Sequence, residues 1–215
     1  MALSANSKRP RPRIESLSDL VFGLALSVGT ISLISRLPSS PVGIVYDIVE
    51  FGFSFLILIT VWISYTSIMS VLPMEDATTI TLNVILLFFV SIEPYLFYLN
   101  AVFDLAGHEI LLNAASVAFA LDMAGLMAIL ALFTHQLTVE EKGLIHKSLL
   151  SNYKRIQISR LIAALLFALT ILPIFWTLTI QNIPLRFYLW FVSLIITQTT
   201  LVTNRTTARA HESDS

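Results

Sequence analysis

Residues 13–31 read RIESLSDLVFGLALSVGTI, and this stretch has the features of a membrane helix that packs closely against its neighbours. No charge follows Asp19, and Gly23, Ala25, Ser27 and Gly29 are small enough to let other backbones approach. At about 100° per residue, one stripe of the helix holds Leu20, Leu24, Ser27, Val28, Ile31 and Ser35. Such a stripe is typical of ordinary buried packing, but around a symmetry axis it would form apolar rings with hydroxyls between them.

The composition places the whole chain in a membrane. Of its 215 residues, 56% are hydrophobic and 13% charged, and the mean hydropathy is +0.81. A soluble domain carries about a quarter charged residues, so most of the outer surface here must face lipid. The composition excludes a soluble enzyme and a disordered protein, and the absence of cysteine excludes a secreted disulfide scaffold.

The apolar runs predict an all-α membrane protein with six transmembrane helices and no extramembrane domain. A bilayer core of about 30 Å needs roughly 20 helical residues, and continuous apolar runs favour helices over a barrel. The runs predict helices at 16–36, 46–71, 79–102, 110–135, 159–180 and 185–204. We therefore expect a cytoplasmic basic tail over 1–15, a transmembrane domain over 16–204 and a cytoplasmic C-terminal tail over 205–215.

The basic residues predict that both termini are cytoplasmic, because positive charge accumulates on that side of a membrane. On one side of a six-span topology lie Lys8, Arg9, Arg11, Arg13, Lys142, Lys147, Lys154, Arg155, Arg160, Arg205 and Arg209. The other side has Arg36 and Arg186. We interpret the basic tail as a topology signal that contacts lipid headgroups, and we expect no nucleic-acid partner.

No enzyme motif is present: the sequence lacks GxSxG, HExxH, a Walker loop and a Gly-rich dinucleotide turn. We therefore expect no enzyme activity, no cofactor and no resident metal. There is also no TVGYG-type filter, so any ion selection must use side chains. The Ser16-x-x-Asp19 spacing fits a capping box but leaves Ser18 unexplained. Asp19 points away from the stripe that holds Leu24, so it should face another helix.

Two acidic residues, Glu93 and Asp122, fall inside predicted spans and are functional candidates by default. Glu93 precedes Pro94, which kinks a helix, and for Asp122 we expect a hydrogen bond to another helix. They support an alternative function, a proton- or cation-coupled secondary transporter. Such transporters usually carry inverted repeats, and none is evident. A non-conducting membrane scaffold is a third possibility.

Two motifs resemble one family. Arg13-x-x-x-Leu17-Ser18-Asp19 is similar to the R-x-x-x-F-S-D signature of the transmembrane protein 175 potassium channels. The run from Asn83 through Ser91 to Pro94 is similar to the family's N-x(7)-S-x-x-P pattern in the third helix. The sequence departs from the family at Leu17, and its run from Trp62 to Thr66 lacks both histidines of the W-x-x-H-H stretch found in prokaryotic members.

The resemblance implies a potassium-preferring cation channel in a prokaryotic plasma membrane, assembled as a homotetramer whose first helix lines the pore. It implies that Leu24, Val28 and Ile31 form apolar gating rings, and that Ser27 sets selectivity through transient contact with potassium ions. Arg13, Ser18, Asp19 and Asn83 would form a polar network that holds the pore helix. The implied selectivity residue, Ser27, and the implied gate residues belong to the stripe that helical periodicity alone predicts.

Overall fold

The structure, a computed structural model, describes residues 13–34, 40–72, 76–105, 107–139, 149–181 and 183–213. The predicted basic tail before Arg13 and the basic residues Arg36, Lys142 and Lys147 lie outside these ranges. The long helices are α1 (Arg13–Ile34), α2 (Pro41–Met69), α3 (Ala77–Leu105), α4 (Glu109–Thr138), α5 (Leu150–Leu169) and α7 (Leu185–Ser213). A short helix α6 (Ile174–Thr177) and a hairpin of β1 (Thr179–Ile180) and β2 (Ile183–Pro184) connect α5 to α7.

The first four helices begin and end within five residues of the predicted limits, because local signals delimit each apolar run. Ser40 caps α2: the backbone N–H of Gly43 donates to its Oγ at 3.1 Å, and Pro41 follows as the first helical residue. Gly107 adopts a φ of +66° between α3 and α4, a conformation that glycine reaches without steric cost.

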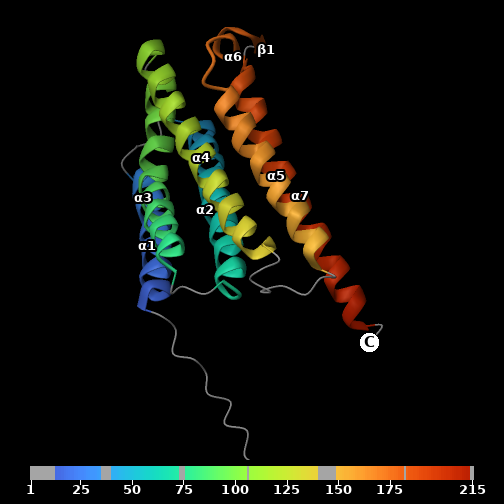
Figure 1. Ribbon diagram of the computed structural model, residues 1–215. Helices are drawn as coiled ribbons and strands as arrows, with labels where there is room; N and C mark the ends of the chain where they lie inside the picture. The colour runs from blue at the N-terminus through green and yellow to red at the C-terminus, as the bar shows by residue number, and fades with distance from the viewer. Residues whose placement is uncertain are drawn as a thin grey trace, which may run out of the picture.

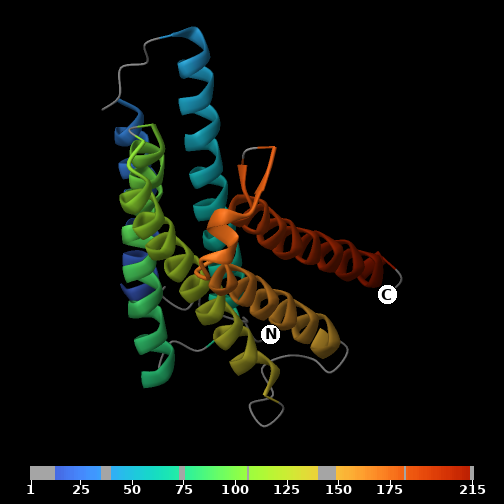
Figure 2. The same cartoon turned by 90° about the horizontal axis from the view of Figure 1, so that it is seen from above.

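The helices form two groups (Figure 1). Helices α1 to α4 lie together, and α5 and α7 lie side by side beside them. Helix α4 connects the groups because it packs against α3 and against α5. The long helices alternate in direction, so α1 begins, α4 ends and α7 ends at the same end of the molecule. Seen from above, α5 and α7 project away from the first group (Figure 2).

The core is apolar and centred on α4. Phe119, Met123, Leu126 and Phe133 of this helix are all buried. The ring of Phe119 lies 4.7 Å from that of Trp190 on α7, centroid to centroid. Aromatic packing across α4 therefore connects the two groups of helices.

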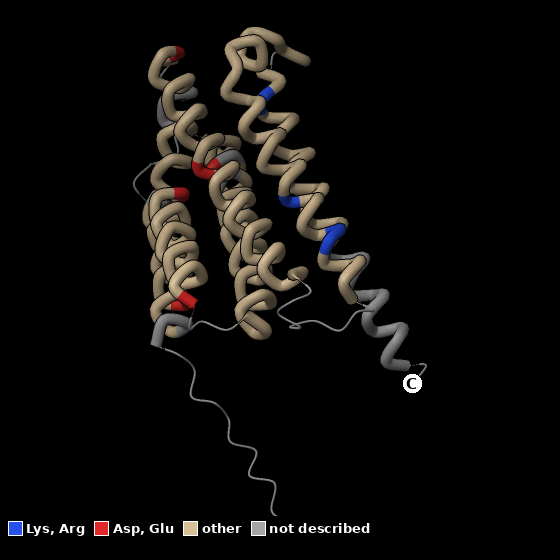
Figure 3. The backbone as a smooth tube through the Cα atoms, viewed as in Figure 1, with Lys and Arg blue, Asp and Glu red and all other residues tan. Residues whose placement is uncertain are grey.

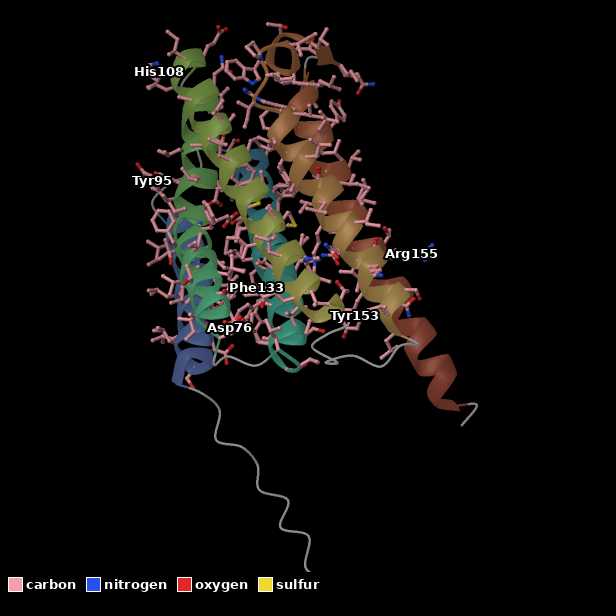
Figure 4. The ribbon with its side chains drawn as sticks, viewed as in Figure 1. Asp76, Tyr95, His108, Phe133, Tyr153 and Arg155 are labelled. Carbon is pink, nitrogen blue, oxygen red and sulfur yellow. The ribbon has the colours of Figure 1, made fainter. Side chains whose placement is uncertain are left out.

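Within the part of the chain that the structure describes, three helices are long and apolar enough to cross a bilayer: α2, α4, and α3 over Ala77–Asn100. The apolar part of α1, Ser16–Ile31, is shorter. The chain is an integral membrane protein, and the count of six spans stays a prediction for the remaining helices. Figure 4 labels Asp76 near the end of the molecule where α4 ends and His108 at the opposite end.

The predicted helix at 159–180 is wrong in its second half, because α5 ends at Leu169. Pro173 has no N–H to donate and its ring would collide with the carbonyl four residues earlier. The chain instead turns, and the indole N–H groups of Trp176 and Trp190 donate to the backbone oxygen and Oγ1 of Thr170, at 2.9 and 3.0 Å. Helix α7 also continues past the predicted end at residue 204, into the expected tail.

Candidate functional site

Helix α1 has two chemically different faces. Ser18, Phe22, Ala25 and Gly29 are buried, at successive spacings of four, three and four residues. This spacing follows one side of an α-helix, and α1 packs with that side against α2 and α3. The ring of Phe22 lies 5.6 Å from the ring of Tyr65 on α2. Packing therefore uses the side of α1 opposite the predicted stripe.

The stripe predicted from periodicity is the exposed face of α1 in the isolated chain. Leu24 is 63% exposed, Ile31 is 61% exposed and Val28 is 41% exposed. Leu20 and Ser27 share this exposure, whereas Ser35 lies outside the described residues. A face this apolar is covered in a membrane by lipid or by another copy of the chain.

The hydroxyl of Ser27 lies on the exposed face but is turned along its own helix. Its Oγ donates a 2.8 Å hydrogen bond to the backbone oxygen of Gly23. Since the hydroxyl hydrogen is used in this bond, the lone pairs of Oγ remain available to accept from water or contact a cation. Thr30 makes the same kind of bond to the oxygen of Leu26, at 3.1 Å.

Ser18 lies at the centre of a buried polar contact among three helices. Its Oγ accepts a hydrogen bond from the Tyr65 hydroxyl of α2 at 2.8 Å, and another from Nδ2 of Asn83 of α3 at 3.2 Å. Ser18 and Asn83 are both fully buried. The structure thus brings together two members of the predicted polar network, Ser18 and Asn83.

Asp19 is half-buried beside this contact, on the side facing α2. Its Oδ1 accepts a 3.2 Å hydrogen bond from Nε1 of Trp62. The fourth predicted member, Arg13, begins α1, but its side chain is outside the described ones. We define the anchor as Ser18, Asp19, Trp62, Tyr65 and Asn83.

Sequence reasoning missed two anchor residues, Trp62 and Tyr65. Both belong to the run from Trp62 to Thr66, whose resemblance to the family's W-x-x-H-H stretch points to the missing histidines and not to the residues in their place. Tyr65 takes the position of the first histidine, and its hydroxyl reaches Ser18. The alignment of the tyrosine with a polar family position was the signal that could have identified it.

Glu93 and Asp122 meet inside the first group of helices. Glu93 is 0% exposed, and the Ser54 hydroxyl of α2 lies 3.3 Å from each of its carboxylate oxygens. Asp122 is 2% exposed and lies near enough to interact electrostatically with Glu93. Within the described residues, neither oxygen of Asp122 has a hydrogen-bond partner, so the interhelical bond predicted for it is not formed.

The residues that the structure describes include no group of three or more histidine or acidic side chains able to hold a metal ion.

Comparisons with known proteins identify the segment that contains α1 and the anchor. Residues 13–94, from the start of α1 to Pro94, match the family described as "Endosomal/lysosomal potassium channel TMEM175". No curated relative matches the sequence.

Two solved structures share the fold along nearly the whole chain. One is a variant of the potassium channel MtTMEM175 in complex with a nanobody–MBP fusion, with a TM-score of 0.63 and 20% identity, covering 97% of this chain and 100% of that one. The other is a lysosomal potassium-selective channel TMEM175 homolog from Chamaesiphon minutus, with a TM-score of 0.60 and 16% identity, covering 89% of this chain and 96% of that one. The family and the structural neighbours are ion channels, not enzymes. Residues 13–94 thus match the TMEM175 family, and the chain as a whole shares the fold of these two potassium channel structures.

Proposed function

We propose that this protein is a potassium-preferring cation channel, formed by four copies of the chain around a pore lined by α1. The observation that carries the proposal is the division of α1 into a buried, anchored face and an exposed face that combines Leu24, Ser27, Val28 and Ile31. The family described for residues 13–94 and both structural neighbours are potassium channels, which supports this function. One helix cannot enclose a pathway by itself, so the pore requires several copies.

In this proposal, Leu24, Val28 and Ile31 are the gate. They are four and three residues apart, so four copies would stack three apolar rings about 6 and 4.5 Å apart along the pore. Narrow apolar rings exclude water when they are closed and admit it when they widen. Small changes in the position of α1 would therefore switch conduction.

Selectivity in this proposal comes from Ser27 beside the Leu24 ring. Potassium holds its hydration shell less tightly than sodium, so it passes an apolar constriction more readily. The Ser27 oxygen, whose hydrogen is bonded to Gly23, can contact a partly dehydrated cation. One hydroxyl ring supplies few ligands, so we expect a weak to moderate preference for potassium over sodium.

The anchor, with Arg13, acts in this proposal as a support of the pore helix and supplies no ion ligand. Ser18 faces away from the exposed stripe and bonds to α2 and α3. We also propose that both termini face the cytoplasm, because most lysine and arginine residues fall on one side of the predicted six-span topology.

The test is a planar-bilayer recording of the purified full chain with potassium on one side and sodium on the other. A channel gives ohmic single-channel currents with a reversal potential displaced toward potassium. Saturable, counter-ion-coupled flux without unitary currents would instead indicate the transporter alternative. Native mass spectrometry from a mild detergent checks the tetramer, and a monomer that persists in native membranes would contradict the pore.

A further inference from the structure

The buried pair of Glu93 and Asp122 is not used by the proposed pore. Glu93 lies on α3 and Asp122 on α4, and both are buried, whereas the exposed stripe of α1 carries no charge. The Ser54 hydroxyl of α2 joins the pair through Glu93. The pair therefore lies within the helix group of one subunit and away from the α1 face that would line the pore.

No basic side chain is available on the helices that carry this cluster. The sequences of α2, α3 and α4 contain no lysine or arginine. The described basic residues, drawn in blue in Figure 3, lie on α5 and α7. Burial in a membrane interior strongly disfavours two uncompensated carboxylates, and like charges at such a site do not both ionise.

Among the residues that the structure describes, the other groups around Glu93 and Asp122 add no positive charge next to the two carboxylates. The charged group that interacts electrostatically with Glu93 is Asp122. The side chain that hydrogen-bonds to Glu93 is Ser54. Asp47 lies two turns before Ser54 on α2 and would add further negative charge. Arg186 of α7 donates from Nη1 to Asn113 at 2.8 Å, nine residues before Asp122 on α4.

We propose that Ser54, Glu93 and Asp122 form a buried proton-binding site whose occupancy controls the position of α1. A proton from a hydronium ion in bulk water adds to a carboxylate oxygen, so the net negative charge of the pair falls by one. The bond that forms is the carboxyl O–H, and the bond that breaks is the O–H of the hydronium ion, which leaves as water. The control of α1 rests on the proposed channel function, whereas the binding of the proton does not.

A direct packing path joins this site to the pore helix. Glu93 is followed by Pro94, and a Cβ placed on Gly29 of α1 would lie 4.0 Å from the Cβ of Pro94. The same Cβ would lie 3.7 Å from the ring of Phe51, which is three residues before Ser54 on α2. Gly29 lies between Val28 and Ile31, so Phe51 and Pro94, which neighbour the cluster in sequence, lie against the back of α1 at the level of two proposed gate rings.

The first experiment tests proton binding alone. Infrared spectra of the full chain in lipid nanodiscs are recorded across a pH series, and the signal is the carbonyl band of a protonated carboxylic acid. We expect this band at neutral pH, we expect Glu93→Gln and Asp122→Asn each to shift or reduce it, and we expect the double variant to abolish it. Asp76→Asn, at an exposed acid, is the matched control and should leave it unchanged. A wild-type protein without the band, or a band that survives unchanged in the double variant, would overturn the proposal.

Ser54→Ala keeps both acids and provides a second test if the Glu93 and Asp122 variants do not fold. It removes the hydrogen-bond donor to Glu93, so the pH at which the band disappears should move. An unmoved transition would count against this cluster. A band that responds to replacing potassium or sodium by choline at constant pH would show a metal cation at the site and would overturn proton binding.

The second experiment measures control of α1. Single-channel open probability is recorded over the pH range in which the band changes, and the open-to-closed ratio should change by up to about tenfold per pH unit for one linked proton. The double variant should flatten this dependence, Glu93→Gln and Asp122→Asn should each shift it, and Asp76→Asn should retain it. A pH-independent wild-type channel would overturn the control. A wild-type protein that never conducts would contradict the proposed function, while the infrared result would still decide on proton binding.

Discussion

The hydroxyl of Tyr65 donates a 2.8 Å hydrogen bond to Oγ of Ser18, and this bond connects the second helix to the buried face of the first. Tyr65 is 2% exposed and Ser18 is 0% exposed, so water cannot replace the bond if it is lost. Asn83 donates to the same oxygen from α3. A single serine hydroxyl thus joins the helix that we propose lines the pore to both of its neighbours.

We expect Tyr65→Phe to reduce the free energy of unfolding by about 0.5–1.5 kcal/mol, because one buried hydrogen bond is lost while the ring remains. Thermal unfolding in lipid nanodiscs measures the change. Tyr95→Phe is the control, since Tyr95 is exposed and points outward from α3 (Figure 4). Equal melting temperatures for Tyr65→Phe and the wild type would show that the bond contributes little.

Asp19→Ala should weaken assembly before it alters selectivity. The substitution leaves the indole N–H of Trp62 without its acceptor, and because Asp19 is only half-buried we expect a cost of about 1–3 kcal/mol. Size-exclusion chromatography in detergent measures the loss of the oligomer. Asp19→Asn tests the opposite assignment. If this variant assembles but has a strongly changed cation preference, Asp19 is an ion ligand and the prediction is wrong.

Leu24→Ala should raise single-channel conductance, because a wider and more easily hydrated ring admits ions more readily. Conductance in symmetric potassium is the measurement. Leu26→Ala is the control on the same helix, since Leu26 is partly buried and packs against the core. If Leu26→Ala changes conductance and Leu24→Ala does not, α1 presents a different face to the pore.

Ser27→Ala should move the potassium-to-sodium permeability ratio toward one with little loss of assembly. The substitution removes the oxygen and keeps the approximate size of the ring. Reversal potentials in opposing potassium and sodium gradients measure the ratio. Ser91→Ala is the control, since the Ser91 hydroxyl makes the same kind of bond to its own helix, to the oxygen of Leu87 at 2.7 Å. An unchanged ratio in a conducting Ser27→Ala channel would locate selection at another residue.

Gly125→Ala should destabilise the protein by about 1–3 kcal/mol, because a Cβ there would lie 2.8 Å from ring atoms of Phe89. Chemical or thermal unfolding measures the effect. Gly52→Ala is the control: nothing lies within 4 Å of its added Cβ within the chain, so we expect no loss of stability. Equal losses in the two variants would mean that the contact with Phe89 relaxes freely.

The sequence predicted the first four helices well because each is an unbroken apolar run with polar residues at both ends. Helical periodicity also placed Leu24, Ser27, Val28 and Ile31 on one side of α1, but it did not reveal that this side is exposed in the isolated chain. The end of α5 was mispredicted, because hydropathy does not distinguish an apolar helix from the apolar turn after Leu169. Periodicity likewise could not identify Tyr65 and Trp62, because it specifies the face of one helix and leaves open which side chains of another helix meet it.

The anchor has a consequence for rotation of α1 about its own axis. Ser18 and Leu24 are six residues apart, about 9 Å along the helix, and lie on opposite faces. The bonds from Tyr65 and Asn83 to Ser18 therefore set the azimuth of the helix at one end. A rotation by one residue, about 100°, would turn Leu24 and Ser27 out of alignment together. Substitutions among residues that no ion touches can thus change conductance and selectivity at once, as a single twist of one helix.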